Sequence, residues 1–312
     1  MSKTTDRLPQ TLLEAIRYFS DLDVCNEFVA SLRWPDGPVC PRCEGTDHSY
    51  LTTRRLWKCK ACQKQFSVKV GTIFEDSPLG LDKWLAAVWL IANSKNGISS
   101  HELGRSIGIT QKSAWFVLHR IRLAMQTGTF EKLSGHVEVD ETFVGGVAKN
   151  MHLGKRRAKI AGTGGVDKTI VLGMVERHGH VHAEVISNVD RPTLHGAIGN
   201  TVEPGATVYT DAHQSYRNLD GYKHEVIDHS REYARGAVHT NTIENFWSLL
   251  KRDLNGTYIS VEPYHLFRYL DERMYAFNHR EETDLRRFAG VLSAVSGRRL
   301  TWVEVTGKLD DR

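Results

Sequence analysis

Four of the five cysteines stand in two Cys-x2-Cys pairs, and this spacing restricts the fold more than any other feature of the chain. Cys40 and Cys43 form the first pair, and Cys59 and Cys62 form the second, with fifteen residues between the pairs. Each pair can present two thiolates from one tight turn, and two such turns complete a tetrahedral Zn²⁺ site with no open coordination position. The spacing therefore predicts a structural zinc ribbon over residues 36–72.

Disulfides or a redox motif would use the same residue type in other ways. A reducing cytosol and the lack of a βαβ pattern around the pairs argue against both. A module of this size has too little core to fold unaided, so the ribbon is expected to depend on its metal. Cys25 is alone in an apolar stretch and is expected to be a small core residue.

Basic residues are in excess only in the first part of the chain. Residues 1–130 hold 17 Lys and Arg against 12 Asp and Glu, whereas residues 131–312 hold 24 against 25. The first part is therefore the better candidate for contacting the phosphates of a nucleic acid. Met1–Gln10 is polar, and no apolar run reaches the roughly 18 residues that would span a membrane, so we expect a cytoplasmic protein.

Apolar residues recur at helical spacing through the basic part. They predict one or two helices over Thr11–Leu32 and another over Leu81–Asn93. Ser99 to Glu102 resembles a helix cap, Gly108 is a break, and a third helix should follow from Thr110 to Met125. Two helices joined by a glycine turn form a helix-turn-helix pattern, with a plain helical bundle as the alternative. The positions expected to face a DNA major groove are Gln111, Lys112, Ser113, Phe116 and Arg120.

The pattern changes to strands after residue 135. His136–Val144 alternates as a strand, and Thr169–Val175 and Val181–Ile186 should form an antiparallel pair. Thr193–Asn200 follows as a helix, and Thr207–Asp211 as a short buried strand. This order predicts an α/β domain with a mixed sheet, in which ligands collect at the carboxyl ends of the strands.

Three carboxylates occupy positions from which they could converge. Asp140 and Asp211 lie on the first and last of these strands. Glu244 lies on a helix predicted over His239–Asn255, where it is expected on the buried face with the apolar residues. Two Mg²⁺ ions about 4 Å apart can promote phosphodiester cleavage, and Mg²⁺ prefers hard oxygen ligands of this kind. Each carboxylate alone could instead cap a turn or a helix or pair with a nearby cation, so only the set predicts a catalytic metal site.

Several long motifs resemble bacterial insertion-sequence transposases of the zinc-ribbon DDE type (ISXO2-like). The resemblance covers roughly residues 10–282. Ile259 departs from the pattern, because relatives often have His at this position, and Ala276 stands where Arg is common. The motifs that carry the resemblance are residues 34–43 (WPDGPVCPRC), 66–77 (FSVKVGTIFEDS), 112–115 (KSAW), 140–146 (DETFVGG), 210–216 (TDAHQSY) and 239–252 (HTNTIENFWSLLKR).

The resemblance implies a ribonuclease-H-like catalytic domain that holds two Mg²⁺ or Mn²⁺ ions with Asp140, Asp211 and Glu244. Asn241, one turn before Glu244, is a secondary catalytic candidate, and Lys251 and Arg252 are available to the DNA backbone. Such enzymes cut double-stranded DNA at the ends of an element and join the freed 3′-hydroxyl groups to target DNA, which suggests a homodimer or higher oligomer and no small-molecule substrate. The implied domains are 1–35 (helical segment), 36–72 (zinc ribbon), 80–127 (helix-turn-helix), 134–285 (catalytic) and 286–312 (tail).

Two other functions remain open from the sequence. A domesticated relative could retain the zinc ribbon and the helix-turn-helix as a DNA-binding regulator that no longer cuts. A metal-dependent nuclease could cut without joining. The basic, glycine-bearing stretch Lys149–Lys168 is expected to form a loop that could clamp DNA, with an ordinary solvated loop as the alternative.

Overall fold

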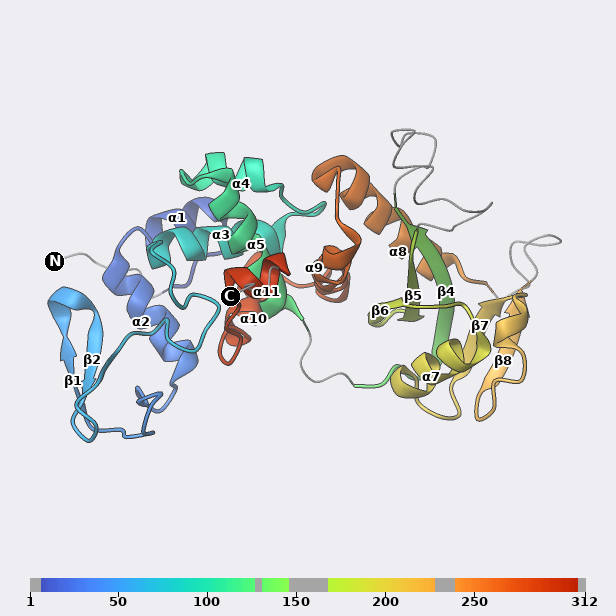
Figure 1. Ribbon diagram of the computed structural model, residues 1–312, viewed down its shortest axis with the longest axis horizontal. Helices are drawn as coiled ribbons and strands as arrows, with labels where there is room; N and C mark the ends of the chain where they lie inside the picture. Colours follow the sequence, from blue (N-terminus) through green and yellow to red (C-terminus); the bar gives the residue numbers. More distant parts are fainter. Residues whose placement is uncertain (1–6, 127–130, 146–167, 228–238, 308–312) are drawn as a thin grey trace. The chain divides into compact units, whose positions relative to one another are not determined.

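The computed structural model describes residues 7–126, 131–145, 168–227 and 239–307 (Figure 1). The chain divides into two compact units, one formed by Met1–Thr127 with His279–Arg312 and the other by Gly128–Asn278. The loop expected over Lys149–Lys168 lies outside the described residues except for Lys168. No helix of the described residues is long and apolar enough to cross a membrane.

The first unit is helical apart from the ribbon. At the start of the first helix, the Thr11 hydroxyl accepts from the Glu14 amide and the Glu14 carboxylate accepts from the Thr11 amide, so both hydrogen bonds of a capping box are present. Buried Cys25 lies on the second helix and donates its thiol to the Phe19 carbonyl, which confirms it as a core residue. The helices of this unit are α1 (Leu12–Tyr18), α2 (Leu22–Arg33), α3 (Leu81–Asn93), α4 (Ser100–Ile107), α5 (Gln111–Met125), α10 (Asp284–Ser293) and α11 (Trp302–Thr306).

The predicted helix-turn-helix is present as α4 and α5. Ser99 caps α4 by accepting from the Glu102 amide, and Thr110 caps α5 by accepting from the Ser113 amide. Gly108 ends α4 with φ of 64°, a left-handed conformation that glycine adopts without steric cost. The capping residues and the glycine break therefore act as the sequence indicated.

The end of the chain packs into the first unit. Helix α10 buries Phe288, Val291 and Leu292, and Phe288 contacts the rings of Phe19 and Trp89. The α10 helix is therefore part of a core that begins near residue 15.

The zinc ribbon is a three-stranded antiparallel sheet in the order β1-β2-β3. Trp57 and Phe66 pair across two of its strands, and their rings stack at 5.9 Å. Trp34 contacts both rings edge-on, so an aromatic cluster supplies the small core of this sheet. The strands are β1 (His48–Leu51), β2 (Leu56–Cys59) and β3 (Gln65–Phe66).

The second unit is built on a five-stranded mixed sheet in the order β6-β5-β4-β7-β8. The pairs β4-β5 and β5-β6 are antiparallel, whereas β4-β7 and β7-β8 are parallel. This topology confirms the mixed-sheet α/β class and is consistent with a ribonuclease-H-like domain. The strands are β4 (His136–Val144), β5 (Thr169–Glu176), β6 (Val181–Ile186), β7 (Thr207–Asp211) and β8 (Lys223–Ile227).

Helices cover both faces of this sheet (Figure 1). Alternate residues of β4 and β5 pack with α7 (Arg191–Thr201) on one face, as in the Val137, Val139 and Leu172 cluster. The other face packs against α8 (Asn241–Arg252) and α9 (Leu266–Asn278). The apolar side of α8 is buried as expected from its spacing, through Ile243, Phe246, Trp247 and Leu250.

Two features of the second unit were not predicted. Strand β8 is an edge strand with mostly exposed side chains, so it lacks the apolar alternation that would reveal it. After α8, the chain continues as a π-helix over Asp253–Tyr258 and ends at Ile259, whose φ is 63° and ψ is −51°. The Ser260 amide donates to the Tyr258 carbonyl at 2.6 Å, so Ile259 is the central residue of a tight, strained γ-turn.

Candidate functional site

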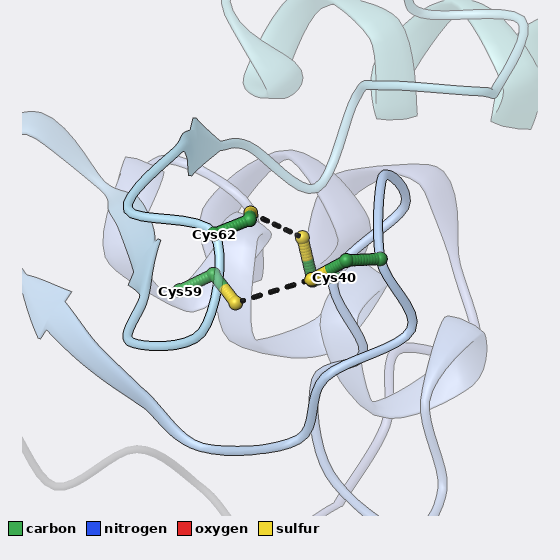
Figure 2. Close-up of side chains that lie close together, drawn as sticks. Cys40, Cys59 and Cys62 are labelled. Atoms are coloured by element: carbon green, nitrogen blue, oxygen red, sulfur yellow. Dashed lines mark hydrogen bonds between the residues drawn. The ribbon is translucent and has the colours of Figure 1, made fainter.

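The four paired cysteines converge on one point (Figure 2). Their sulfur atoms all lie within 4.8 Å of one another, and Cys40 Sγ is 3.7 Å from Cys62 Sγ while Cys43 Sγ is 3.6 Å from Cys59 Sγ. A disulfide would need about 2 Å. A tetrahedral Zn²⁺ with Zn–S bonds of about 2.3 Å separates its sulfur ligands by about 3.8 Å. The thiols therefore fit a structural zinc ion.

The two turns that carry these cysteines have the same backbone form. The residue after each pair, Glu44 in one turn and Gln63 in the other, has φ of 59°. Gly45 lies against the sulfurs, because a Cβ atom there would be 3.3 Å from Cys59 Sγ and 3.5 Å from Cys43 Sγ. Both turns are thus shaped to aim their thiols inward, which supports the zinc interpretation.

Asp140 lies in the middle of β4, and Asp211 is the last residue of the neighbouring parallel strand β7. Strands β4 and β7 pair with Glu138 beside Tyr209, and continuing this register by two residues sets Asp140 beside Asp211. Both then project from the face of the sheet that α8 covers, because side chains alternate along a strand. The strand pairing brings together two carboxylates that are 71 positions apart in sequence.

Glu244 reaches the same region from α8. It lines a cavity of about 510 Å³ together with Asp140, Glu141 and Trp247. The sequence suggested a carboxylate on the buried side of the helix, and this is wrong: Glu244 is exposed, one position away from buried Ile243. Thr240 donates its hydroxyl to Glu244 Oε1 at 3.3 Å. Glu244 therefore borders the cavity from its solvent side.

The electrostatics of Asp140 are those of a site that favours a cation. Burial, reinforced by the negative charges of Glu141 and Asp211, raises the pKa of Asp140 to about 6, although a hydrogen bond from Trp247 lowers it. Such crowding disfavours the ionised form until a positive charge arrives. Carboxylate oxygens are the ligands that Mg²⁺ and Mn²⁺ prefer, so these residues fit a divalent cation.

Glu141 is a third carboxylate that lines the cavity, and the sequence did not single it out. Tyr216 donates its hydroxyl to Glu141 Oε2, and Tyr216 is itself buried in the core on the α7 face of the sheet. Burial raises the pKa of Glu141, the Tyr216 hydrogen bond lowers it, and the charge of Asp211 raises it. Because side chains alternate along a strand, Glu141 projects from the face of β4 opposite to that of Asp140, and it still lines the cavity.

Glu138 is also absent from the predicted site, and it anchors the start of α8. Its side chain is fully buried and accepts from the Thr242 amide at 2.7 Å and from the Ile243 amide at 3.1 Å. Arg177 pairs with the same carboxylate at 2.7 Å and also donates to the His239 carbonyl. A carboxylate at a helix N-terminus satisfies free amides and complements the helix dipole. Glu138 thus holds the helix that carries Glu244.

The other predicted residues on α8 are exposed. Asn241 is the first residue of the helix and lies one turn before Glu244. Lys251 lines the cavity with Glu244, so a cation borders the acidic group, whereas Arg252 is exposed beside it without lining the cavity. Among the described residues, only the four cysteines form a ligand group with all donor atoms within 4.8 Å, so the carboxylates are not in such close contact.

The residues of α5 that were expected to face a DNA major groove differ in their exposure to solvent. Gln111 and Lys112 are exposed at its start, where Gln111 donates to Ser100 and the Lys112 ammonium lies 4.8 Å from the centre of the Trp302 ring. Ser113 is half-buried and takes part in the cap of the helix.

The expected exposure of Arg120 is wrong. Arg120 is only 4% exposed, and its guanidinium donates to the carbonyls of Leu300, Ile73 and Glu75 at 2.6–2.9 Å. Its partners are far away in sequence, so no local pattern could reveal this role. Phe116, which was also expected to face DNA, is half-buried, with its ring against the Trp302 ring.

Comparison with known proteins finds family matches for both the zinc ribbon and the second unit. Residues 132–278 match the family model of the ISXO2-like transposase domain, and residues 21–65 match that of the transposase zinc-ribbon domain. An uncharacterised protein in transposable element ISH50 of Halobacterium salinarum is 28% identical over 245 residues, which cover 73% of this chain and 81% of that protein. An uncharacterised transposase-like protein of Haemophilus influenzae is 36% identical over 103 residues, which cover 32% of this chain and 83% of that protein.

Proposed function

The chain belongs to the family of ISXO2-like transposases with a zinc ribbon, and we propose that it cuts DNA at the ends of its element and joins the 3′-hydroxyl ends to target DNA. The observation that carries this proposal is that Asp140 has a carboxylate neighbour on each of two other elements. Asp211, the last residue of the adjacent parallel strand β7, lies close enough to raise the pKa of Asp140, and Glu244 of α8 borders the same cavity as Asp140. A cavity open to solvent is what a DNA strand would need for access.

In this proposal, Asp140, Asp211 and Glu244 hold divalent cations, with Glu141 beside them. Bound Mg²⁺ or Mn²⁺ would supply activation of the attacking oxygen and neutralisation of charge on the phosphate. The crowded carboxylates keep the site acidic and selective for cations. Asn241 is a further polar group on the same stripe of α8 as Glu244.

Lys251 is proposed to contact the phosphate next to the scissile bond. It lies two turns after Glu244 on the same stripe of α8 and lines the cavity, so it can offer a positive charge to the backbone without occupying the carboxylate cluster. Arg252, which is exposed on the next position, would contact the backbone farther from the cavity.

We propose that the first unit selects the element ends. The zinc ribbon and the start of α5, with exposed Gln111 and Lys112 and half-buried Ser113, form its DNA-facing elements. Because two ends must be joined, the active form is proposed to be a homodimer or a higher oligomer on DNA.

A strand-transfer assay tests the function. Purified protein is incubated with Mg²⁺ and DNA that carries the terminal repeats of the element, and cleaved and joined products are separated on a gel. Wild type should give both products, whereas Asp140→Asn, Asp211→Asn and Glu244→Gln should give neither and still bind DNA. Glu225→Gln, on the exposed edge strand β8, is the matched control and should retain both products.

Each outcome of this assay separates the proposed function from its alternatives. Cleavage without joining would indicate a nuclease. Specific binding without cleavage by the wild type would indicate a regulator. Full activity in the three carboxylate variants would show that the active site lies elsewhere.

A further inference from the structure

Trp247 connects the core of the second unit to the acidic site. Its indole Nε1 donates a hydrogen bond to Asp140 Oδ2 at 2.9 Å, and the side chain is 4% exposed. The same indole lines the cavity beside Glu244 and packs against the Phe246 ring. One edge of the indole therefore packs in the hydrophobic core, and the other edge donates a hydrogen bond to the Asp140 carboxylate.

The chemistry of this contact suits a positioning role. An indole N–H is a donor only, so Trp247 cannot accept a proton and cannot compete for a cation. The carboxylate torsion of an aspartate is broad, and a donor on one oxygen restricts it. With Oδ2 held by Trp247, the direction of Oδ1 is also defined. Partners of this kind orient metal-binding carboxylates.

Gly173 provides the space that Trp247 occupies. It pairs directly with Asp140 across β4 and β5, so both residues project from the same face of the sheet. A Cβ atom at Gly173 would lie 2.5 Å from both Cζ2 and Cη2 of Trp247, and 2.8 Å from Ile243 Cδ1. Carbon atoms in contact lie about 3.5–4.0 Å apart, so even alanine would displace the indole.

We propose that Trp247 is a positioning residue that orients Asp140 for divalent-cation binding, and that Gly173 acts as its partner by leaving room for the indole. This inference rests on the proposed function, because it assigns Trp247 and Gly173 to the same metal site. It predicts that the two residues affect cation binding through one shared contact.

Cation binding by the zinc-loaded, DNA-free full chain tests this inference directly. Mn²⁺ affinity is measured by isothermal titration calorimetry and by electron paramagnetic resonance of free Mn²⁺. Trp247→Phe retains an aromatic ring but loses the donor, and it should weaken Mn²⁺ binding roughly 10- to 100-fold. Trp84→Phe is the matched control, because it removes another buried indole donor, here to Ser77 Oγ, and should leave the affinity unchanged.

A double-mutant cycle tests the role of Gly173. Gly173→Ala should weaken Mn²⁺ binding by a similar factor, since it displaces the indole. Combining it with Trp247→Phe should cause little further loss, because the smaller ring frees the space and the hydrogen bond is already gone. Circular dichroism confirms that each variant is folded.

The outcomes distinguish this inference from the function on which it rests. If wild type binds Mn²⁺, Asp140→Asn does not, and folded Trp247→Phe binds as tightly as wild type, the positioning role is overturned and the metal site stands. Fully additive losses in the double variant would overturn the shared contact. If wild type fails to bind Mn²⁺, or Asp140→Asn binds it equally well, both proposals fail.

Discussion

Asp140→Asn should make the cation-free protein more stable while it abolishes cleavage. Asp140 is crowded by Glu141 and Asp211 and is half-buried, so its ionised form is costly in the folded chain. Asparagine removes that charge and retains an oxygen that can accept from Trp247 Nε1. A residue retained for stability would show the opposite effect, so the sign of the change is informative.

The magnitude follows from the pKa of Asp140. Folding raises this pKa from 3.8 to about 6, and each unit corresponds to about 1.4 kcal/mol. The ionised carboxyl therefore lowers the free energy of unfolding by up to about 3 kcal/mol above pH 6. Because the raised pKa makes the folded chain bind the proton more tightly, this penalty declines as pH falls through 6 and vanishes below about pH 4. The difference in free energy of unfolding between Asp140→Asn and wild type should depend on pH in the same way.

Urea denaturation from pH 4 to pH 8, with and without Mn²⁺, measures this effect. Without the cation, the free energy of unfolding of Asp140→Asn should exceed that of wild type by up to about 3 kcal/mol at pH 7 and match it near pH 4. Mn²⁺ at about 100 times its dissociation constant should add about 2.7 kcal/mol to wild type and nothing to the variant.

Glu138→Gln is the matched control on the same strand and the same face. Its carboxylate is fully buried, but it is paired with Arg177 and two amides of α8. Removing one partner of a buried pair should destabilise the protein by about 3 kcal/mol. If Asp140→Asn also destabilises at pH 7, or if its effect does not change between pH 4 and pH 8, the reasoning about the site is refuted.

Four further predictions concern other parts of the chain. Arg120→Met should lower the free energy of unfolding by about 3 kcal/mol, since it leaves buried carbonyls without a donor, and weaker DNA binding by the folded variant would contradict this purely structural role. Lys112→Ala should instead weaken DNA binding and reduce its salt dependence by about one unit of slope in filter-binding assays. Cys59→Ser should reduce bound zinc, measured by atomic absorption, from one ion to none and open the ribbon to proteolysis, and a retained ion would exclude the four-thiol site. Ile259→Gly should stabilise the protein by about 1 kcal/mol in urea denaturation because it relieves a positive φ at an exposed position, and a loss of stability would show that the isoleucine side chain is needed for packing.

Spacing along the chain was sufficient for several features that depend on near neighbours. The two Cys-x2-Cys turns, the caps of α4 and α5, and the strand β4 lie where the sequence predicts them. Asp140, Asp211 and Glu244 were named as one set from their places on two predicted strands and a helix and from the family motifs that contain them. Their assignment as metal ligands stays a prediction.

Only the tertiary structure decided which partners each side chain meets. Arg120 follows a helical pattern that suggests exposure, yet segments 45 to 180 residues away cover it. Glu138 and Gly173 have no local signal, because their roles depend on how β4 pairs with β5 and packs against α8. Burial and hydrogen bonding between distant segments arise from strand pairing and helix packing, and a linear pattern does not encode that geometry.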